Sequence, residues 1–264
     1  MIERPYIGVT GATTTQEVEH LVSAFRTNGV SKEALHEPMI GILVSHKTLN
    51  GQTVLNRRYP DFANVPSLLK ITENYSFNTI HYNSRQMDGL SDQIKGLFVG
   101  GIYTDGLCRG IQLNIPWPPI KEISYVKRAF PDLKIIMQLS QTSLAGLSPR
   151  ETTRLVAKYA DMIDYALIDP SGGKGIPFNP RGVIPYYLDL QEELPNLALG
   201  FAGGFTGENV KKRCRELIDL VGADSFSIDA EGGLRDSISN AYGDDIYNSQ
   251  RVENYIKAAQ EIFT

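Results

Sequence analysis

The sequence predicts a single (β/α)8 barrel that spans residues 1–264. Eight short apolar runs recur along the chain, and an amphipathic helical pattern follows each of them. Parallel strands require crossover connections of this kind. Eight strand–helix units in a chain of this length match a closed barrel better than a doubly wound sheet, which has about five to seven strands.

Each predicted strand is a short, mainly apolar run, and the pattern between strands changes to helical periodicity. The predicted strands are residues 6–10, 39–45, 78–83, 106–115, 133–140, 165–169, 197–202 and 225–230. The predicted helices are residues 16–25, 66–74, 92–98, 120–130, 149–162, 183–194, 208–220 and 248–262.

Local signals support several of these boundaries. Ser148, followed by proline and then by Glu151, forms a capping box with proline at the first helical position. Thr206 is expected to cap the seventh helix in a similar way. The long loop 48–64, rich in Asn, Arg and Tyr, follows the second strand and is expected to act as a lid or an interface.

Composition excludes several classes of protein. The formal charge of −4 gives no sign of a nucleic-acid partner, and 42% hydrophobic residues are ample for one core. No apolar stretch reaches the ~18 residues of a membrane span, and the start of the chain lacks a signal-peptide pattern, so a cytoplasmic protein is expected. Cys108 and Cys214 are isolated, which argues against a disulfide framework or zinc site. We expect no metal and no cofactor.

Three glycine-rich loops follow successive strands near the C-terminus and are expected to bind phosphate. Paired glycines at the end of a strand allow positive φ and close approach of a ligand, and the helix that follows offers unpaired N–H groups. A glycine-rich turn without a ligand is the structural alternative. The expected phosphate-binding residues are Gly172, Gly173, Lys174 and Gly175 in the first loop, Gly203 and Gly204 in the second, and Gly232 and Gly233 in the third.

The barrel fold makes strand ends the candidates for chemistry, because ligands bind at the C-terminal face. The polar residues there are Thr10, Thr13, Ser45, His46, Lys47, His81, Asn83, Asn114, Ser140, Asp169, Asp229 and Glu231. Each taken singly is as well explained by a hydrogen bond to a neighbouring loop. Asp169 and Asp229 stand out, because Asp169 ends an apolar run that should direct its carboxylate into the barrel mouth as an acid or base.

These motifs resemble the phosphoribosylanthranilate isomerases, members of the ribulose-phosphate-binding barrels that perform an Amadori rearrangement in tryptophan biosynthesis. Asp169, the glycines and Lys174 that follow it, and Phe178 resemble that family's aspartate, Gly-Gly-Thr-Gly and phenylalanine. Residues 202–210 are similar to its Ala-Gly-Gly-Leu-Thr-Pro-Glu-Asn-Val. Weaker similarities are found in residues 7–10, 110–114 and 229–233. The resemblance implies the same fold, a phosphate site and Asp169 as general acid.

The sequence departs from the family at the residues that carry its chemistry. The family's general base is a cysteine that ends the first strand, and Ile7 stands in its place. Asn114 replaces a histidine and Arg235 replaces a glutamate, so we expect a rebuilt substrate pocket that includes Asn114, Lys47 and Arg235. The candidates for a substitute base are His46, Glu231 and Lys47.

Two hypotheses for function remain open from the sequence alone. The first is an enzyme that acts on a small phosphorylated sugar or phosphoribosyl compound by acid–base isomerisation or a related reaction, including a lyase reaction, with Asp169, His46, Asp229 and Glu231 as candidate catalytic residues. The second is a barrel that retains the phosphate site without catalysis and serves as a sensor or partner subunit. A homodimer is left open.

Overall fold

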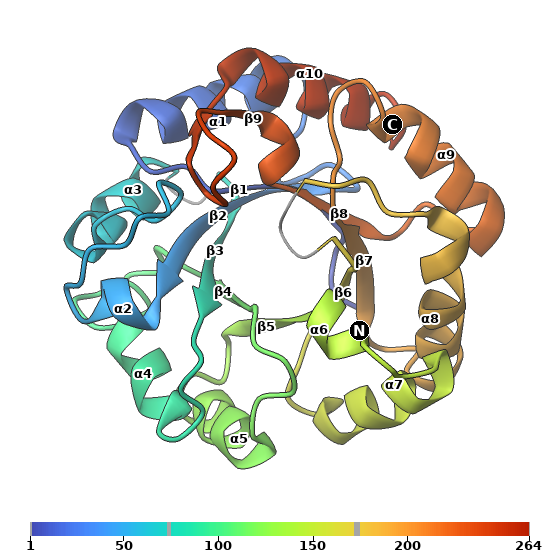
Figure 1. The fold of residues 1–264 in the computed structure, drawn as a ribbon, viewed down its shortest axis with the longest axis horizontal. Helices are drawn as coiled ribbons and strands as arrows, with labels where there is room; N and C mark the ends of the chain where they lie inside the picture. The colour runs from blue at the N-terminus through green and yellow to red at the C-terminus, as the bar shows by residue number, and fades with distance from the viewer. Residues whose placement is uncertain (1, 73–74, 172–174, 264) are drawn as a thin grey trace.

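Eight parallel strands close into a barrel in the computed structural model, which describes residues 2–72, 75–171 and 175–263 (Figure 1). The predicted (β/α)8 fold is therefore confirmed. The strands are β1 (Tyr6–Thr10), β2 (Glu37–Ser45), β3 (Phe77–Asn83), β4 (Gly110–Leu113), β5 (Lys134–Ser140), β6 (Tyr165–Asp169), β7 (Ala198–Ala202) and β8 (Ser227–Ala230).

Helices surround the barrel and cover its outer face (Figure 1). The long helices are α1 (Thr15–Thr27), α3 (Val65–Ile71), α4 (Leu90–Leu97), α5 (Ile120–Ala129), α7 (Pro149–Val156), α8 (Pro180–Glu193), α9 (Val210–Val221) and α10 (Ser249–Gln260). The short elements are α2 (His46–Leu49), α6 (Gln141–Leu144), the 3-10 turns η1 (Phe62–Asn64), η2 (Ala157–Tyr159) and η3 (Gly232–Leu234), and the hairpin β9 (Arg235–Ser237) and β10 (Asp245–Tyr247).

The local signals account for some boundaries and not for others. The capping box of α7 is confirmed, since Ser148 and Glu151 exchange both expected hydrogen bonds. Strand β4 is shorter than the predicted 106–115, because the segment before it forms turns in which Gly106 has φ 70°. Thr206 does not cap α9: that helix begins at Val210, and its N-cap residue makes no side-chain cap bond. The last two residues of the second predicted helix, 73–74, lie outside the described residues.

Side chains inside the barrel form an apolar layer below and a polar layer above. Tyr6, Phe77 and Tyr165 begin their strands, and their ring centroids lie 5.6–6.0 Å apart at the N-terminal end. Alternate strand residues point outward into the main core between strands and helices, which includes Ile7. Several buried polar side chains, such as Asp169, lie at the C-terminal end of the strands. The apolar layer closes the lower end of the barrel, and the candidate site residues lie at the upper one.

No helix within the described ranges is both long and apolar enough to cross a membrane. Both cysteines are buried and unbridged, as their isolation in the sequence predicts.

The tight lower layer leads to a test of the barrel's internal packing. A Cβ at Gly110 would lie 2.7 Å from Phe77 Cζ, whereas one at Gly96, inside α4, would meet only Leu49 at 3.8 Å. We expect Gly110→Ala to lower the free energy of unfolding by about 1–3 kcal/mol through overpacking. The control Gly96→Ala should raise it by about 0.5–1 kcal/mol, because alanine is the better helix former. Urea unfolding measures both, and equal effects would contradict the packing described.

Candidate functional site

A chain of buried hydrogen bonds joins the strand ends across the barrel mouth. The Thr10 hydroxyl donates to Asp229 Oδ1 at 3.1 Å, and Gln112 Nε2 lies 3.4 Å from Asp229 Oδ2. The same Gln112 nitrogen lies 3.4 Å from Gln138 Oε1, and Gln138 Nε2 donates to Asp169 Oδ2 at 2.6 Å. Two carboxylates from β6 and β8 are thus linked through two amides from β4 and β5.

Asp169 lies at the mouth, where the sequence placed it, and its carboxylate is fully engaged. Besides the bond from Gln138, it accepts bonds from the Ser171 N–H at 3.0 Å and the Ser171 hydroxyl at 2.6 Å. It also lies against the second glycine loop, because a Cβ on Gly203 would be 3.0 Å from Asp169 Oδ1. These contacts fix the carboxylate and join it to the loop after β7.

Asp229 is the carboxyl group whose environment changes its protonation most. Burial, reinforced by the nearby charge of Glu231, raises the pKa of Asp229 to about 7, against the opposing effect of hydrogen bonds from Thr10 and Gln112. The group therefore exchanges its proton near neutral pH. That is the range in which an acid–base catalyst is effective.

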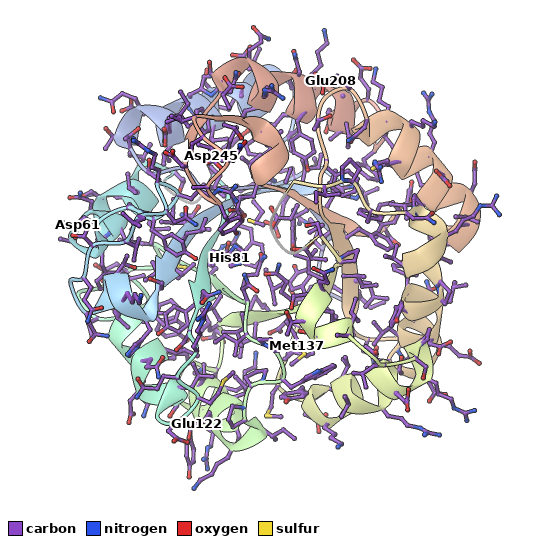
Figure 2. The ribbon with its side chains drawn as sticks, viewed as in Figure 1. Asp61, His81, Glu122, Met137, Glu208 and Asp245 are labelled. Carbon is purple, nitrogen blue, oxygen red and sulfur yellow. The ribbon has the colours of Figure 1, made fainter. Side chains whose placement is uncertain are left out.

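His81 and Glu231 complete the mouth from β3 and from the turn after β8. Glu231 Oε2 lies 3.9 Å from His81 Nδ1, and Glu231 Oε1 accepts a bond from Arg58 Nη1 at 2.7 Å. Burial lowers the pKa of His81, although the charges of Glu231 and Asp169 oppose the shift. Figure 2 shows His81 near the barrel axis, whereas the labelled side chains of Asp61, Glu122 and Glu208 lie on the outer rim.

The predicted lid, loop 48–64, is clamped to the hairpin that follows β8. Arg58 is buried and pairs with Asp245, whose Oδ2 lies 2.6 Å from Arg58 Nη2. Asp245 also accepts a bond from Arg235 Nε at 2.5 Å, and Arg235 Nη1 donates to the Gly11 carbonyl at 2.9 Å. Buried charges persist when they are paired and hydrogen-bonded in this way. Arg235, which the sequence predicts to bind substrate, is engaged in the clamp and is not among the residues that line the mouth cavity.

The glycine loops after β6, β7 and β8 meet at the mouth. Gly203 and Gly204 have φ of 113° and 64°, the conformation that the sequence predicted. Both are buried, and within the described residues neither N–H donates a hydrogen bond. Gly175 packs against Gly232, because a Cβ on Gly175 would lie 3.0 Å from the Gly232 carbonyl carbon. The remaining predicted phosphate residues of the first loop, Gly172, Gly173 and Lys174, lie outside the described residues.

A cavity of about 30 Å³ lies where these groups meet. Its walls are His81, Gln112, Gln138, Asp169, Ser171, Gly175, Ala202, Gly203, Gly204, Asp229, Glu231 and Gly232. Its volume holds about one water molecule. Within the described part of the chain, both ring nitrogens of His81 and Oε1 of Gln112 are buried here without a hydrogen-bond partner. Unpaired buried polar groups are rare in folded proteins, so their concentration here indicates a binding site.

Some predicted site residues lie outside this cavity. His46 and Lys47 begin the short helix α2 and do not line it; Asn50 Nδ2 donates to the His46 carbonyl at 2.7 Å. Asn114 lies just after β4, and its backbone N–H donates to the Tyr82 carbonyl. Ile7, which the sequence resemblance places at the position of a cysteine, points outward into the main core, and the Thr10 side chain of β1 bonds Asp229 at the mouth.

Residues that the sequence analysis did not select supply much of the mouth. Gln112 and Gln138 each interrupt an apolar strand, and a polar residue between two buried apolar ones in a parallel barrel faces the interior. That pattern was sufficient to identify both. Arg58 carries no comparable signal, because its role depends on how a long loop folds onto a distant hairpin.

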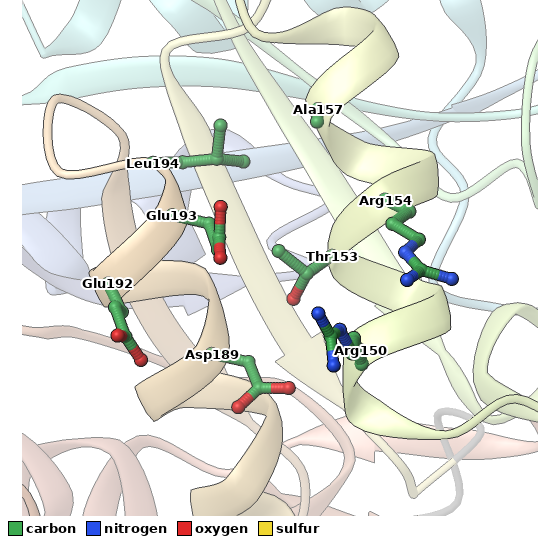
Figure 3. Close-up of a pocket in the computed structure, with 8 residues that line it drawn as sticks. All are labelled: Arg150, Thr153, Arg154, Ala157, Asp189, Glu192, Glu193 and Leu194. Atoms are coloured by element: carbon green, nitrogen blue, oxygen red, sulfur yellow. The ribbon is translucent and has the colours of Figure 1, made fainter.

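A larger cavity, of about 460 Å³, lies outside the barrel between α7 and α8 (Figure 3). Figure 3 shows Arg150 on α7 directed toward Asp189 on α8, and Arg154, Glu192 and Glu193 also line this groove. None of the residues around the mouth cavity contributes to its walls. It is a surface groove between neighbouring helices, separate from the site at the strand ends.

Solved structures with the same fold include proteins of different functions. The phosphoribosyl anthranilate isomerase of Thermotoga maritima is 16% identical, with TM-score 0.61, and the match covers 97% of this chain and 99% of that one. The tryptophan synthase alpha subunit of Legionella pneumophila is 14% identical, with TM-score 0.57 and 98% and 91% covered. The catalytic domain of a chitinase from Pyrococcus furiosus is 13% identical, with TM-score 0.59 and 100% and 97% covered.

No family model matches the chain, and no curated protein matches it in sequence. Similarity at these identities establishes the fold, a (β/α)8 barrel, and does not establish a function.

The contact between the glycine loops leads to a prediction about Gly204. A Cβ at Gly204 would lie 2.5 Å from the Ile176 carbonyl carbon, whereas Gly146, with a similar φ of 73°, has no atom within 4 Å of its added Cβ. We expect Gly146→Ala to lower the free energy of unfolding by about 1 kcal/mol from backbone strain alone. Gly204→Ala should lower it by about 1–3 kcal/mol more, because the loop after β6 must move. Equal losses in chemical denaturation would show that the loops do not touch.

The raised pKa of Asp229 makes a prediction about stability and pH. Between its ordinary pKa and about 7, the folded protein holds a proton on Asp229 that the unfolded chain releases, so rising pH favours unfolding. Asp229→Asn removes this titration. The free energy of unfolding of Asp229→Asn minus that of wild type should therefore be larger at about pH 8 than at about pH 5, by about 1.4 kcal/mol or more. The same difference at both pH values would refute the shift.

Proposed function

We propose that the protein is an enzyme that performs acid–base chemistry on a small phosphorylated sugar or phosphoribosyl compound at the barrel mouth. The observation that carries the proposal is the convergence of unsatisfied groups on one cavity. The Gln112 oxygen, the His81 ring nitrogens and the N–H groups of Gly203 and Gly204 lack partners within the described residues, and all belong to its walls. Such groups in a site that also holds Asp229, a carboxyl group with a raised pKa, favour a ligand that is chemically transformed.

The loop after β7 is the proposed phosphate end of this site. Gly203 and Gly204 present adjacent N–H groups, and α9 begins a few residues later at Val210, with its N-terminal end toward this loop. Backbone N–H groups and the positive end of a helix dipole together favour an anion.

The carboxyl groups of Asp229 and Asp169 form the proposed reactive end. Asp229 holds its proton up to about pH 7 and is suited to donate it to the carbonyl or ring oxygen of a sugar. Asp169 is fixed by three hydrogen bonds beside the phosphate loop and is placed to orient the substrate or to exchange a proton with it. In an isomerisation, such a group both gives a proton and takes one back. A lyase reaction is the related alternative.

The size of the cavity adds a condition to this proposal. A volume of about 30 Å³ does not admit a sugar phosphate, so we expect the loops around the cavity to move apart when a ligand binds. The cysteine chemistry of the isomerases is not expected, because Ile7 points away from the mouth. The proposed enzyme therefore shares a barrel with those isomerases and uses a different base.

A thermal-shift series tests ligand binding first. Ribose 5-phosphate and ribulose 5-phosphate should each raise the melting temperature, with about 2.7 kcal/mol of stabilisation at one hundred times the dissociation constant. Unphosphorylated ribose and ribulose are the matched controls and should have little effect. No response to any member of a sugar-phosphate panel would refute the phosphate site.

Turnover tests the reaction. For a substrate found in that panel, Asp229→Asn and Asp169→Asn should each lower kcat by about a hundredfold or more. The ligand should still raise the melting temperature of both variants. Rescue of a strain lacking phosphoribosylanthranilate isomerase is not expected, and efficient rescue would contradict the different base. Binding without turnover of any panel member would favour the non-catalytic barrel instead.

A further inference from the structure

We propose that His81 is the general base of the mouth site and that Glu231, anchored by Arg58, is the residue that positions it. The inference rests on the proposed function, since it assigns the proton acceptor that acid–base chemistry requires. The proposed base is a histidine on β3, whereas the base of the phosphoribosylanthranilate isomerases is a residue that ends the first strand.

The burial of His81 without partners is the first support. The side chain is 5% exposed, and within the described residues neither ring nitrogen has a hydrogen-bond partner. The other buried histidine, His36, bonds the Phe226 carbonyl at 3.0 Å and stacks on Phe263. His81 contributes no such bond to folding, and its imidazole lines the same cavity as both carboxylates. A polar group kept there without a structural partner is available to a substrate.

The fixed position of Glu231 is the second support. Its carboxylate is held by Arg58 at 2.7 Å, and Arg58 is itself held by Asp245 and lies 5.0 Å from the ring centroid of Tyr242. Because Glu231 lies 3.9 Å from His81 Nδ1, it favours the tautomer with the proton on Nδ1. The lone pair then resides on Nε2. This arrangement matches a base oriented by a third group.

The charged groups around His81 keep the imidazole neutral. Burial is the largest effect and lowers the pKa of His81 below its ordinary value, and Arg58 acts in the same direction. The charges of Glu231 and Asp169 and the nearby Gln138 side chain oppose the shift. The partner acid is Asp229, whose pKa is raised to about 7 by burial and by Glu231 and Asp169. Between these two pKa values the base is unprotonated and the acid is protonated. We therefore expect a bell-shaped pH profile with its basic limb near pH 7.

The reaction that these two groups perform is a proton transfer in two balanced steps. His81 Nε2 takes the proton from the carbon beside the substrate carbonyl, and that C–H electron pair forms a carbon–carbon double bond. The carbonyl oxygen takes the proton of Asp229, which gives a neutral enediol, an imidazolium and a carboxylate. The imidazolium then gives its proton to the former carbonyl carbon, and the other hydroxyl of the enediol gives its proton to Asp229 and becomes the new carbonyl. No oxidant or cofactor is needed.

The other candidates for the base are less suitable by position. His46 and Lys47 do not line the cavity. Glu231 is occupied by the ion pair with Arg58, and Asp169 accepts three hydrogen bonds. Among the described side chains of the cavity, His81 alone presents nitrogen lone pairs without a partner.

Exchange of substrate hydrogen in heavy water tests the assignment. Ribulose 5-phosphate is the probe, because a base acting beside its carbonyl exchanges carbon-bound hydrogen for deuterium, which NMR detects. We expect exchange by wild type and a loss of about a hundredfold or more in His81→Gln. The control His20→Gln alters a histidine that bonds Tyr247 and Glu253 outside the mouth and should exchange normally. Glu231→Gln should move both limbs of the pH profile to lower pH, because Glu231 raises the pKa of His81 and of Asp229, with little change in KM.

The outcomes separate the base from the proposed function. Exchange by wild type that persists in His81→Gln, or that is lost in His46→Gln instead, overturns the assignment of His81. If wild type exchanges no hydrogen of any keto or aldo sugar phosphate in a panel, the result counts against the proposed function. The protonation state and tautomer of His81 can then be measured without a substrate.

Nitrogen NMR of labelled histidine supplies that second readout. His81, identified by the signal lost in His81→Gln, should be neutral at about pH 7 with its proton on Nδ1, and Glu231→Gln should reduce that tautomer preference. An imidazolium at neutral pH, or a proton on Nε2 that does not respond to Glu231→Gln, would overturn the proposal. Circular dichroism should show that His81→Gln and a second variant, His81→Phe, remain folded, because neither removes a hydrogen bond of the described structure.

Discussion

The requirement that buried polar groups be satisfied governs the upper end of this barrel. Closing eight strands brings their C-terminal ends into one ring, where Thr10, Gln112, Gln138, Asp169 and Asp229 face one another away from water. Most of their donors and acceptors pair across the ring. Among the described residues, the Gln112 oxygen does not pair, and it lines the same small cavity as the unpaired ring nitrogens of His81. The site is thus defined by what the fold leaves unsatisfied.

The clamp between the β2 loop and the β9–β10 hairpin gives this ring its electrostatic character. Arg58 brings a buried positive charge to Glu231, and Asp245 balances Arg58 and Arg235 together. Removing one member of such a network leaves an unpaired buried charge, so the members depend on each other. Because Glu231 is held as a carboxylate near Asp229, it helps to keep the Asp229 proton in place. A structural ion-pair network therefore also contributes to the raised pKa of Asp229, to which burial contributes most.

The sequence predicted the architecture well and the chemistry only in part. Eight strand–helix units and the capping box at Ser148 depend on local patterns, and these were confirmed. The positive φ of Gly203 and Gly204 follows from residue type at a strand end. The positions of Asp169 and Asp229 at the mouth follow from strand order in a barrel. The alternation of inward and outward side chains on β4 and β5 also predicts that Gln112 and Gln138 face the barrel interior.

Other features depend on contacts that local patterns do not contain. The clamp joins Arg58 to a hairpin nearly two hundred residues away, and it also engages Arg235. The outward direction of Ile7 depends on the register of β1, and a shift of one residue reverses the face of every side chain on a strand. The small cavity reflects loop packing, in which the glycines of three loops approach one another where a phosphate was expected to lie.

Carbon NMR of the aspartate carboxyl groups is the most direct test of the central claim, that the mouth holds a proton on Asp229 near neutral pH. One aspartate carboxyl carbon should titrate with a midpoint of about 7, and its signal should be absent from the Asp229→Asn spectrum. If every aspartate carboxyl titrates below about pH 5, the mouth does not hold the proton that acid–base chemistry needs, and the claim is contradicted.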